Sequence, residues 1–123
     1  MTRQIELAVS MAAKSTSKFR LGAVLARRKR VISAGYNQMQ KTHPLQNRYY
    51  DGDGTLGLHA EIHACIGVSA ADLDGAEMFV ARLLHNGETA MAKPCATCMK
   101  FMRSVGIRKV TYTTADGIEE LVL

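Results

Sequence analysis

Long apolar runs and cysteines are both scarce in this sequence, and each shortage excludes a class of protein. No stretch approaches the ~18 consecutive apolar residues that a membrane-spanning helix needs. Three cysteines in 123 residues are too few for a disulfide scaffold and instead favour a metal site in a reducing compartment. The first residues include an acidic side chain, Glu6, and lack the apolar core of a secretory signal. We therefore expect a cytoplasmic protein without membrane contact.

The size and composition predict one globular domain over residues 1–123. A chain of this length buries roughly two-thirds of its unfolded surface around a single core. Its apolar content of 47% is ordinary for a globular protein. The sequence contains no internal repeat and no low-complexity segment. A second domain is therefore not expected.

Positive charge exceeds negative charge, with a formal net charge of +5. This excess favours a partner that carries phosphate, whether a mononucleotide or a polymer. The densest basic run is Arg27–Arg30, which lies between two segments typical of strands. Such a run favours a solvated hairpin tip, and a contact with phosphate or nucleic acid is the alternative.

Hydrophobic periodicity predicts an α/β protein in which a helix and a β-hairpin precede a helix, strand, helix and strand. Residues 3–14 have helical spacing, and the short segments after them are partly β-branched. The expected elements are a helix at 3–14, strands at 21–26 and 31–36, an irregular connection at 37–58, a helix at 59–70, a strand at 76–84, a helix with Pro94 in its first position that ends at Gly106, and a strand at 107–113. Such crossovers make the sheet at least partly parallel, with the apolar strand at 76–84 in its centre. The tail at 118–123 fits either an edge strand or a surface segment.

Two fragments far apart in the sequence carry the residue types of a metal site: His59-Ala60-Glu61 and Pro94-Cys95-Ala96-Thr97-Cys98. The two cysteines are three residues apart at the start of a predicted helix, so they share one face, and the helix dipole there favours thiolates. One histidine and two cysteines supply three corners of a zinc tetrahedron and leave the fourth for water. Glu61 then fits a proton carrier beside the metal, because a fourth ligand would close the site. The two fragments together predict a hydrolytic zinc enzyme.

Two further residues of the predicted helix at 59–70 could in principle reach the metal. Cys65 lies among apolar neighbours, and we interpret it as a small core residue, with a ligand or reactive thiol as the alternative. His63 is one helical turn from His59, and a helix-surface or interface histidine is favoured there. If His63, His85 or Cys65 completed four protein ligands, the metal would be structural and the chain a binding module.

The two fragments resemble the H-x-E and P-C-x-x-C signature of zinc-dependent nucleobase deaminases. The sequence is most similar to the cytidine and deoxycytidylate deaminase superfamily, and within it to the deoxycytidylate branch. The resemblance covers residues 20–113 and includes Gly35-Tyr36-Asn37 and residues 106–110. It implies a three-layer α/β/α fold with a mixed sheet of about five strands.

The resemblance also implies a role for each candidate site residue. His59, Cys95 and Cys98 would hold one catalytic Zn²⁺ per chain, Glu61 would shuttle the proton, the backbone of Ala60 would contact the base, and Asn37 would hydrogen-bond the sugar or base. Activated water would replace the exocyclic amine of cytosine, which leaves as ammonia. The expected reaction is the conversion of dCMP to dUMP.

The segment after Asn37 differs from the usual nucleotide-binding sequence of the deoxycytidylate branch, since Thr42-His43-Pro44 stands in its place. His43 and Arg48 are candidate substrate contacts in this connection, against the alternatives of a solvated histidine and a subunit contact. A base in single-stranded DNA or RNA is the alternative substrate, with Arg27–Arg30 following the backbone. Relatives with this small sheet usually assemble, so we expect a homo-oligomer.

Overall fold

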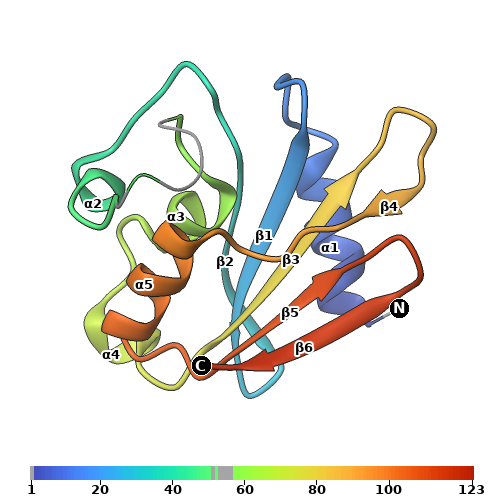
Figure 1. Cartoon of the computed structure of the whole chain (residues 1–123). Helices are drawn as coiled ribbons and strands as arrows, with labels where there is room; N and C mark the ends of the chain where they lie inside the picture. The colour runs from blue at the N-terminus through green and yellow to red at the C-terminus, as the bar shows by residue number, and fades with distance from the viewer. Residues whose placement is uncertain (1, 51, 53–56) are drawn as a thin grey trace.

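The protein is described here by a computed structural model that covers residues 2–50, 52 and 57–123. In chain order its elements are α1 (Arg3–Ala12), β1 (Arg20–Arg27), β2 (Arg30–Tyr36), α2 (Pro44–Asn47), α3 (Ala60–Cys65), α4 (Ala70–Leu73), β3 (Glu77–Leu83), β4 (Thr89–Ala90), α5 (Ala96–Ser104), β5 (Lys109–Thr113) and β6 (Ile118–Val122). The sheet separates α1 from α3 and α5, which gives three layers (Figure 1). In the described part of the chain, no helix is both long and apolar enough to cross a membrane.

The sheet is mixed, and its strand order is β2-β1-β3-β5-β6, with the two-residue β4 paired to the end of β3. Strands β3 and β5 are parallel, whereas the β1–β2, β1–β3 and β5–β6 pairs are antiparallel. The predicted central position of the strand at 76–84 is thus confirmed. The tail, for which two alternatives were open, forms the edge strand β6.

Helix α1 covers one face of the sheet. Ile5 and Ala8 are fully buried against Val24 and Phe79 from β1 and β3. The approach is closest at Gly22, where a Cβ atom would meet the backbone of helix α1. A glycine at this position therefore lets α1 lie directly on β1.

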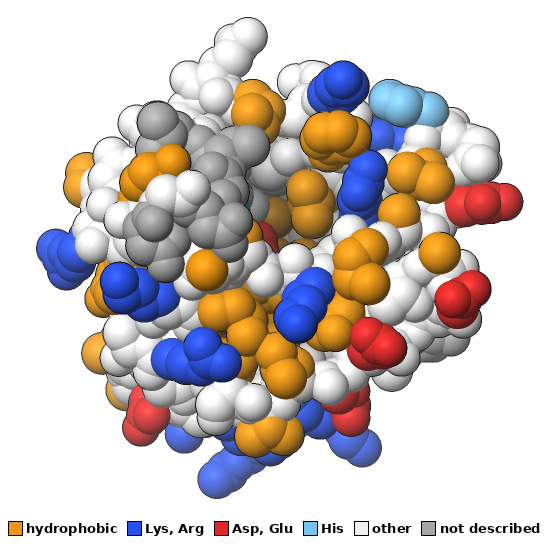
Figure 2. Space-filling model, viewed as in Figure 1, with side chains coloured by type: hydrophobic (Ala, Val, Ile, Leu, Met, Phe, Trp, Pro, Cys, Tyr) orange, Lys and Arg blue, Asp and Glu red, His pale blue; other side chains and the backbone are white. Residues whose placement is uncertain are grey.

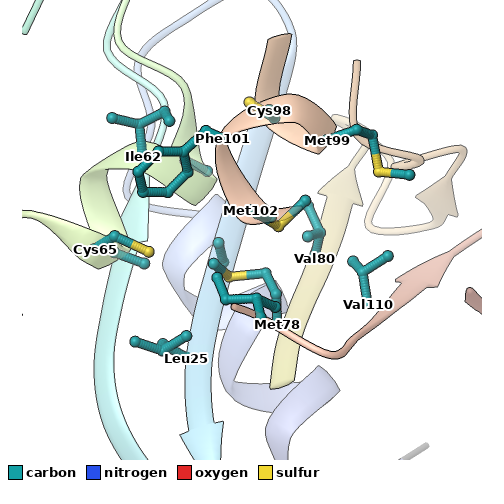
Figure 3. Close-up of a cluster of buried hydrophobic side chains, with 14 of the residues drawn as sticks. Leu25, Ile62, Cys65, Met78, Val80, Cys98, Met99, Phe101, Met102 and Val110 are labelled. Atoms are coloured by element: carbon teal, nitrogen blue, oxygen red, sulfur yellow. The ribbon is translucent and has the colours of Figure 1, made fainter. Parts of the chain in front are cut away.

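Helices α3 and α5 cover the other face, over the larger part of the core. Phe101 and Met102 of α5 pack towards Met78 and the neighbouring strands, with Cys65 of α3 beside them (Figure 3). Cys65 is 2% exposed, which confirms that it is a core residue, and burial raises the pKa of its thiol to about 12. Packing on this face fixes the N-termini of both helices at the same edge of the sheet.

The prediction of one helix over 59–70 is wrong, because the chain forms two short helices there. Helix α3 ends at Cys65, and Gly67 has a φ of +79°, a conformation that helix residues do not adopt. Ser69 then begins α4 by accepting a hydrogen bond from the backbone N–H of Asp72 at 3.2 Å. The apolar spacing continues across the break, so periodicity alone does not reveal it.

Three other local predictions also need correction. Pro94 precedes the N-cap residue of α5, Cys95, and so lies outside the first helical turn. The segment at 37–58 contains the short helix α2, which His43 caps by accepting a hydrogen bond from Leu45 N–H at 3.1 Å. The link after β3 contains β4. All three features are too short for periodicity to predict.

Candidate metal centre and active site

Two helix N-termini bring the predicted metal ligands together. His59 is the N-cap residue of α3 and Cys95 is the N-cap residue of α5, and neither side chain caps its own helix. Cys98 lies in the first turn of α5 and is buried. The positive ends of the two helix dipoles therefore lie beside the sulfur atoms, which favours their thiolate form.

The three predicted ligands form one compact cluster. Their ligand atoms all lie within 4.8 Å of one another. The Nδ1 atom of His59 is 3.2 Å from Cys98 Sγ and 3.5 Å from Cys95 Sγ. In a tetrahedral zinc site the ligand atoms are separated by roughly 3.5–3.8 Å, given Zn–S and Zn–N bonds of about 2.3 and 2.0 Å. The donor set and its spacing therefore fit zinc.

Cys95 and Cys98 share a proton unequally. A hydrogen bond from Cys98 lowers the pKa of Cys95 to about 4, against the opposing effect of partial burial. The same hydrogen bond, together with burial, raises the pKa of Cys98 well above its usual range. These opposite shifts favour the thiolate form of Cys95 and the thiol form of Cys98, and a zinc ion that binds both sulfurs must displace the proton of Cys98.

Glu61 lies in the first turn of α3, next to the cluster, and is 4% exposed. Burial raises the pKa of its carboxyl group above the usual value, although the nearby His59 acts in the opposite direction. It does not belong to the group of potential ligands. A buried carboxyl group with a raised pKa beside a metal centre suits proton transfer near neutral pH.

Gln46 of α2 holds the predicted metal ligand His59 in place, and sequence reasoning did not single it out. Its side chain is 1% exposed. The Nε2 atom donates to Gly57 O at 2.7 Å, and the Oε1 atom accepts from His59 N–H at 2.8 Å. A polar residue in a segment without periodicity gives no signal for such a contact, because both partners lie more than ten residues further along the chain.

A cavity of ≈ 370 Å³ opens beside the group of predicted metal ligands. Figure 2 shows the hollow near the centre of this face, with apolar and basic side chains around it. The lining residues are Lys18, Phe19, Leu21, Asn37, Met39, His59, Ala60, Glu61, Lys93, Pro94 and Cys95. The predicted substrate contacts Asn37 and Ala60 are thus among them. Sequence reasoning missed Phe19 and the two lysines, which lie in loops without a motif.

Asn37 joins the cavity wall to the start of β1. Its Oδ1 atom accepts from Leu21 N–H at 3.0 Å, and its Nδ2 atom donates to Phe19 O at 2.6 Å. The side chain is 6% exposed. Asn37 therefore fixes the backbone that carries Phe19, in addition to lining the cavity itself.

His43 and Arg48 do not line this cavity. The ring of His43 caps α2, and Arg48 is the exposed C-cap residue of the same helix. Their predicted roles as substrate contacts stay predictions. Both side chains lie in the α2 segment, whose buried Gln46 reaches His59.

His63 lies outside the metal cluster. Its Nδ1 atom accepts a hydrogen bond from Tyr36 N–H at 3.0 Å, and its ring contacts the Tyr36 ring edge-on at 5.3 Å between centroids. Within residues 2–50, 52 and 57–123, the ligand group consists of His59, Cys95 and Cys98. These residues therefore provide three ligands, as a zinc centre with room for water requires.

The chain belongs to the cytidine and deoxycytidylate deaminase family, because the model of that family's zinc-binding region matches residues 1–114. The fold and the His, Cys, Cys cluster agree with this assignment. No curated protein sequence matched the chain.

Three solved structures share the fold. Cytidine deaminase from Burkholderia pseudomallei is 22% identical, with a TM-score of 0.67 over 99% of this chain and 93% of that one. The apo dCMP deaminase from cyanophage S-TIM5 is 22% identical, with a TM-score of 0.63 over 93% and 86% of the two chains. The complex of the cyanophage enzyme with dCMP and dUMP matches at 20% identity, with a TM-score of 0.55 over 93% and 84%. The chain therefore has the cytidine deaminase-like α/β fold, as predicted.

Proposed function

We propose that the chain catalyses the zinc-dependent hydrolytic deamination of cytosine in a free nucleotide, converting dCMP and water to dUMP and ammonia. The observation that carries this proposal is the buried carboxyl group of Glu61 beside a three-ligand metal cluster, at the wall of a cavity of ≈ 370 Å³. A cavity of this size suits one pyrimidine ring with part of its sugar. Family membership supports the deaminase chemistry.

The site residues have separate roles in zinc binding, substrate binding and proton transfer. His59, Cys95 and Cys98 would hold the zinc ion, which supplies a water molecule of lowered pKa when bound. Glu61 transfers one proton of the attacking water to the pyrimidine ring and then the second proton of that water to the amine, which leaves as ammonia. The backbone of Ala60 and the amide of Asn37 contact the base and the sugar, since both residues line the cavity.

A second hollow supports a substrate that carries a 5′-phosphate. It has a volume of ≈ 290 Å³ and shares Asn37 and Met39 with the main cavity. Its lining includes the basic residues Lys14 and Lys41 and the hydroxyl groups of Thr16 and Ser17, and none of the described residues that line it is acidic. Ammonium and hydroxyl groups are donors that recognise phosphate. The cyanophage neighbour, solved with dCMP and dUMP, acts on such a nucleotide.

The test is a direct assay of ammonia release from dCMP, CMP, dCTP, deoxycytidine and a single-stranded oligonucleotide. We expect dCMP to give the highest kcat/KM. The Glu61→Gln variant should still bind zinc. Its rate of ammonia release should be about 10²–10⁴-fold lower than that of the wild type. Absence of turnover for all five compounds by the zinc-loaded protein contradicts the proposal, and preferred turnover of the oligonucleotide replaces it with a polynucleotide substrate.

The phosphate contact has its own test. The double variant Lys14→Gln, Lys41→Gln should raise the KM for dCMP about 10²-fold, since each of the two charged hydrogen bonds contributes about 1.5 kcal/mol or more. The KM for deoxycytidine should stay the same. Lys100→Gln, on an exposed part of α5, serves as a control that removes a lysine elsewhere. An equal rise in KM for both substrates contradicts the phosphate assignment.

The expected homo-oligomer and the expected cytoplasmic location belong to this proposal as well. Large apolar side chains are exposed at the edges of the sheet, with Val122 of β6 77% exposed and Val31 of β2 42% exposed. Burying such side chains between copies stabilises an assembly. Analytical ultracentrifugation of the zinc-loaded protein measures its oligomeric state. A monomer at micromolar concentration contradicts the expected assembly. The free thiols of all three cysteines agree with a reducing compartment.

A further inference from the structure

Positive charge is concentrated at the tip of the β1–β2 hairpin, away from the active site. Strand β1 begins beside Phe19, which lines the catalytic cavity, and ends at Arg27. The tip adds Arg28, Lys29 and Arg30, which are all exposed. In Figure 1 this turn lies at the lower end of the sheet, and basic side chains gather at the same edge in Figure 2. The eight residues of β1 separate the tip from the cavity by about 26 Å.

The charges at the tip are not neutralised within the described chain. The side chains of Arg28, Lys29 and Arg30 make no ion pair and no hydrogen bond with any described residue, although the backbone carbonyl of Lys29 accepts from Gln4 Nε2. Arg27 is held differently, since its Nη1 atom donates to Ala71 O at 2.7 Å. Three cations therefore remain available to an external anion, beside a fourth whose position is fixed.

Two hollows flank the tip and meet there. One, of ≈ 580 Å³, is lined by Arg27, Arg28, Arg30, Val31, Ile32 and Asp72. The other, of ≈ 610 Å³, is lined by Arg3, Gln4, Glu6, Leu7, Ser10, Lys29, Arg30 and Val31. Together they contain five cations and two acidic residues, and neither contains an aromatic side chain. This lining can bind phosphate groups but offers no platform on which a base could stack.

The turn itself is occupied by residues that do not favour its geometry. Arg28 and Lys29 have φ values of 51° and 68°, and two-residue hairpin turns with positive φ at both positions strongly prefer Asn-Gly or Asp-Gly. Long cationic side chains at these positions sacrifice turn stability. Two cations in a solvated loop contribute to solubility, and in an anion-binding tip they also place two charges at its most exposed point.

We propose that the hairpin tip is a docking site for the phosphate backbone of a nucleic acid, separate from the catalytic cavity. A strand with successive phosphates can contact cations in both hollows at once, and a single free phosphate cannot. Because the lining has no aromatic side chain, binding at the tip does not depend on base sequence. The proposal does not depend on which substrate the active site deaminates.

The test compares two variants that remove the same charge from different places. The variant Arg28→Asn, Lys29→Gly introduces the preferred turn sequence, so it should fold at least as stably as the wild type. The matched control is Lys100→Gln, Arg103→Gln, which removes two exposed cations from α5. Fluorescence anisotropy of a labelled single strand of about 20 nucleotides, and of the matching duplex, gives the affinity between about 50 and 200 mM salt.

We expect the tip variant to bind the nucleic acid at least about tenfold more weakly than the wild type at low salt, with the slope of log K against log salt reduced by about 2. The control variant should bind within about twofold of the wild type, and the melting temperature of the tip variant should be equal or higher. Equal losses in both variants show a general charge effect and overturn the proposal, as does the absence of binding by the wild type. If inorganic tripolyphosphate competes as well as the oligonucleotide at equal phosphate concentration, the site binds a small anion instead of a strand, which also overturns it.

Discussion

Replacing Gln46 with methionine tests whether the α2 segment positions the metal ligand His59. Methionine has a similar unbranched shape, so the change removes the hydrogen bonds of the Gln46 amide without leaving a large cavity. These bonds include those to Gly57 O and from His59 N–H, at 2.7 and 2.8 Å. An unsatisfied buried polar group costs about 1–3 kcal/mol, so the two backbone groups together lower the free energy of unfolding by about 2–6 kcal/mol. A typical domain of this size has only about 5–15 kcal/mol in total.

The same substitution should weaken zinc binding, because His59 is the ligand whose backbone Gln46 holds. Removing an interaction that orients a metal ligand typically lowers metal affinity by about 10–100-fold. Urea unfolding of the zinc-free protein measures the stability change, and competition with a chromophoric chelator measures zinc affinity. Gln4→Met is the matched control, since Gln4 Nε2 also donates to a backbone carbonyl, that of Lys29, at 3.2 Å, but at an exposed position.

The control should change stability by less than about 0.5 kcal/mol and should leave zinc affinity unaltered. If Gln46→Met matches the control in both measurements, the α2 segment does not position His59 and the reasoning is wrong. If the free energy of unfolding falls while zinc affinity does not, Gln46 stabilises the α2 segment but does not position His59.

Three further predictions concern the site and the sheet. Cys95→Ala should abolish stable zinc binding at stoichiometric metal and lower the melting temperature, as metal titration and calorimetry can show. Gly22→Ala should destabilise the protein by about 1–3 kcal/mol or more in urea unfolding, because the added methyl group meets the backbone of α1; a neutral effect contradicts the close packing. Burial raises the pKa of Glu61 above 4.5, so this carboxyl group binds more protons in the folded zinc-free protein than in the unfolded chain above that pH. The contribution of Glu61 to stability should therefore be lost as pH rises from about 4.5 through the raised pKa, while the lowered pKa of Cys95 acts in the opposite direction. The stability of the wild type relative to Glu61→Gln should fall over this range, and parallel pH profiles of the two proteins contradict the assignment.

The sequence allowed the metal cluster to be predicted because its geometry follows from local rules. Cys95 and Cys98 lie in one helical turn, and their side of α5 is set by Met102 and its apolar neighbours, so the structure places them as expected. His59 lies beside the two cysteines because a second helix begins at the same edge of the sheet. The predicted order of helix, strand, helix and strand already implied this placement.

Other features depend on contacts that no periodic pattern encodes. Gln46 reaches Gly57 and His59 across an irregular segment, and its burial could not be inferred from a polar neighbourhood. The break of the helix at 59–70 depends on the positive φ of Gly67, while the apolar spacing around it still indicates a helix. The loop residue Phe19 lines the cavity, and its backbone is held by a hydrogen bond from the Asn37 side chain, a contact that no periodic pattern encodes.

The metal cluster and the cavity wall are built from different parts of the chain, and this separation has a consequence for specificity. The ligands occupy the N-termini of α3 and α5, which the core packing on the sheet holds in place. Much of the wall comes from the loops before β1 and after β2, with Lys18, Phe19 and Met39, and the Asn37 amide joins these two loops. Loop substitutions can therefore alter the shape and charge of the wall without moving a ligand atom. The identity of the substrate should thus depend on these loops, whereas metal binding should depend on the two helix N-termini.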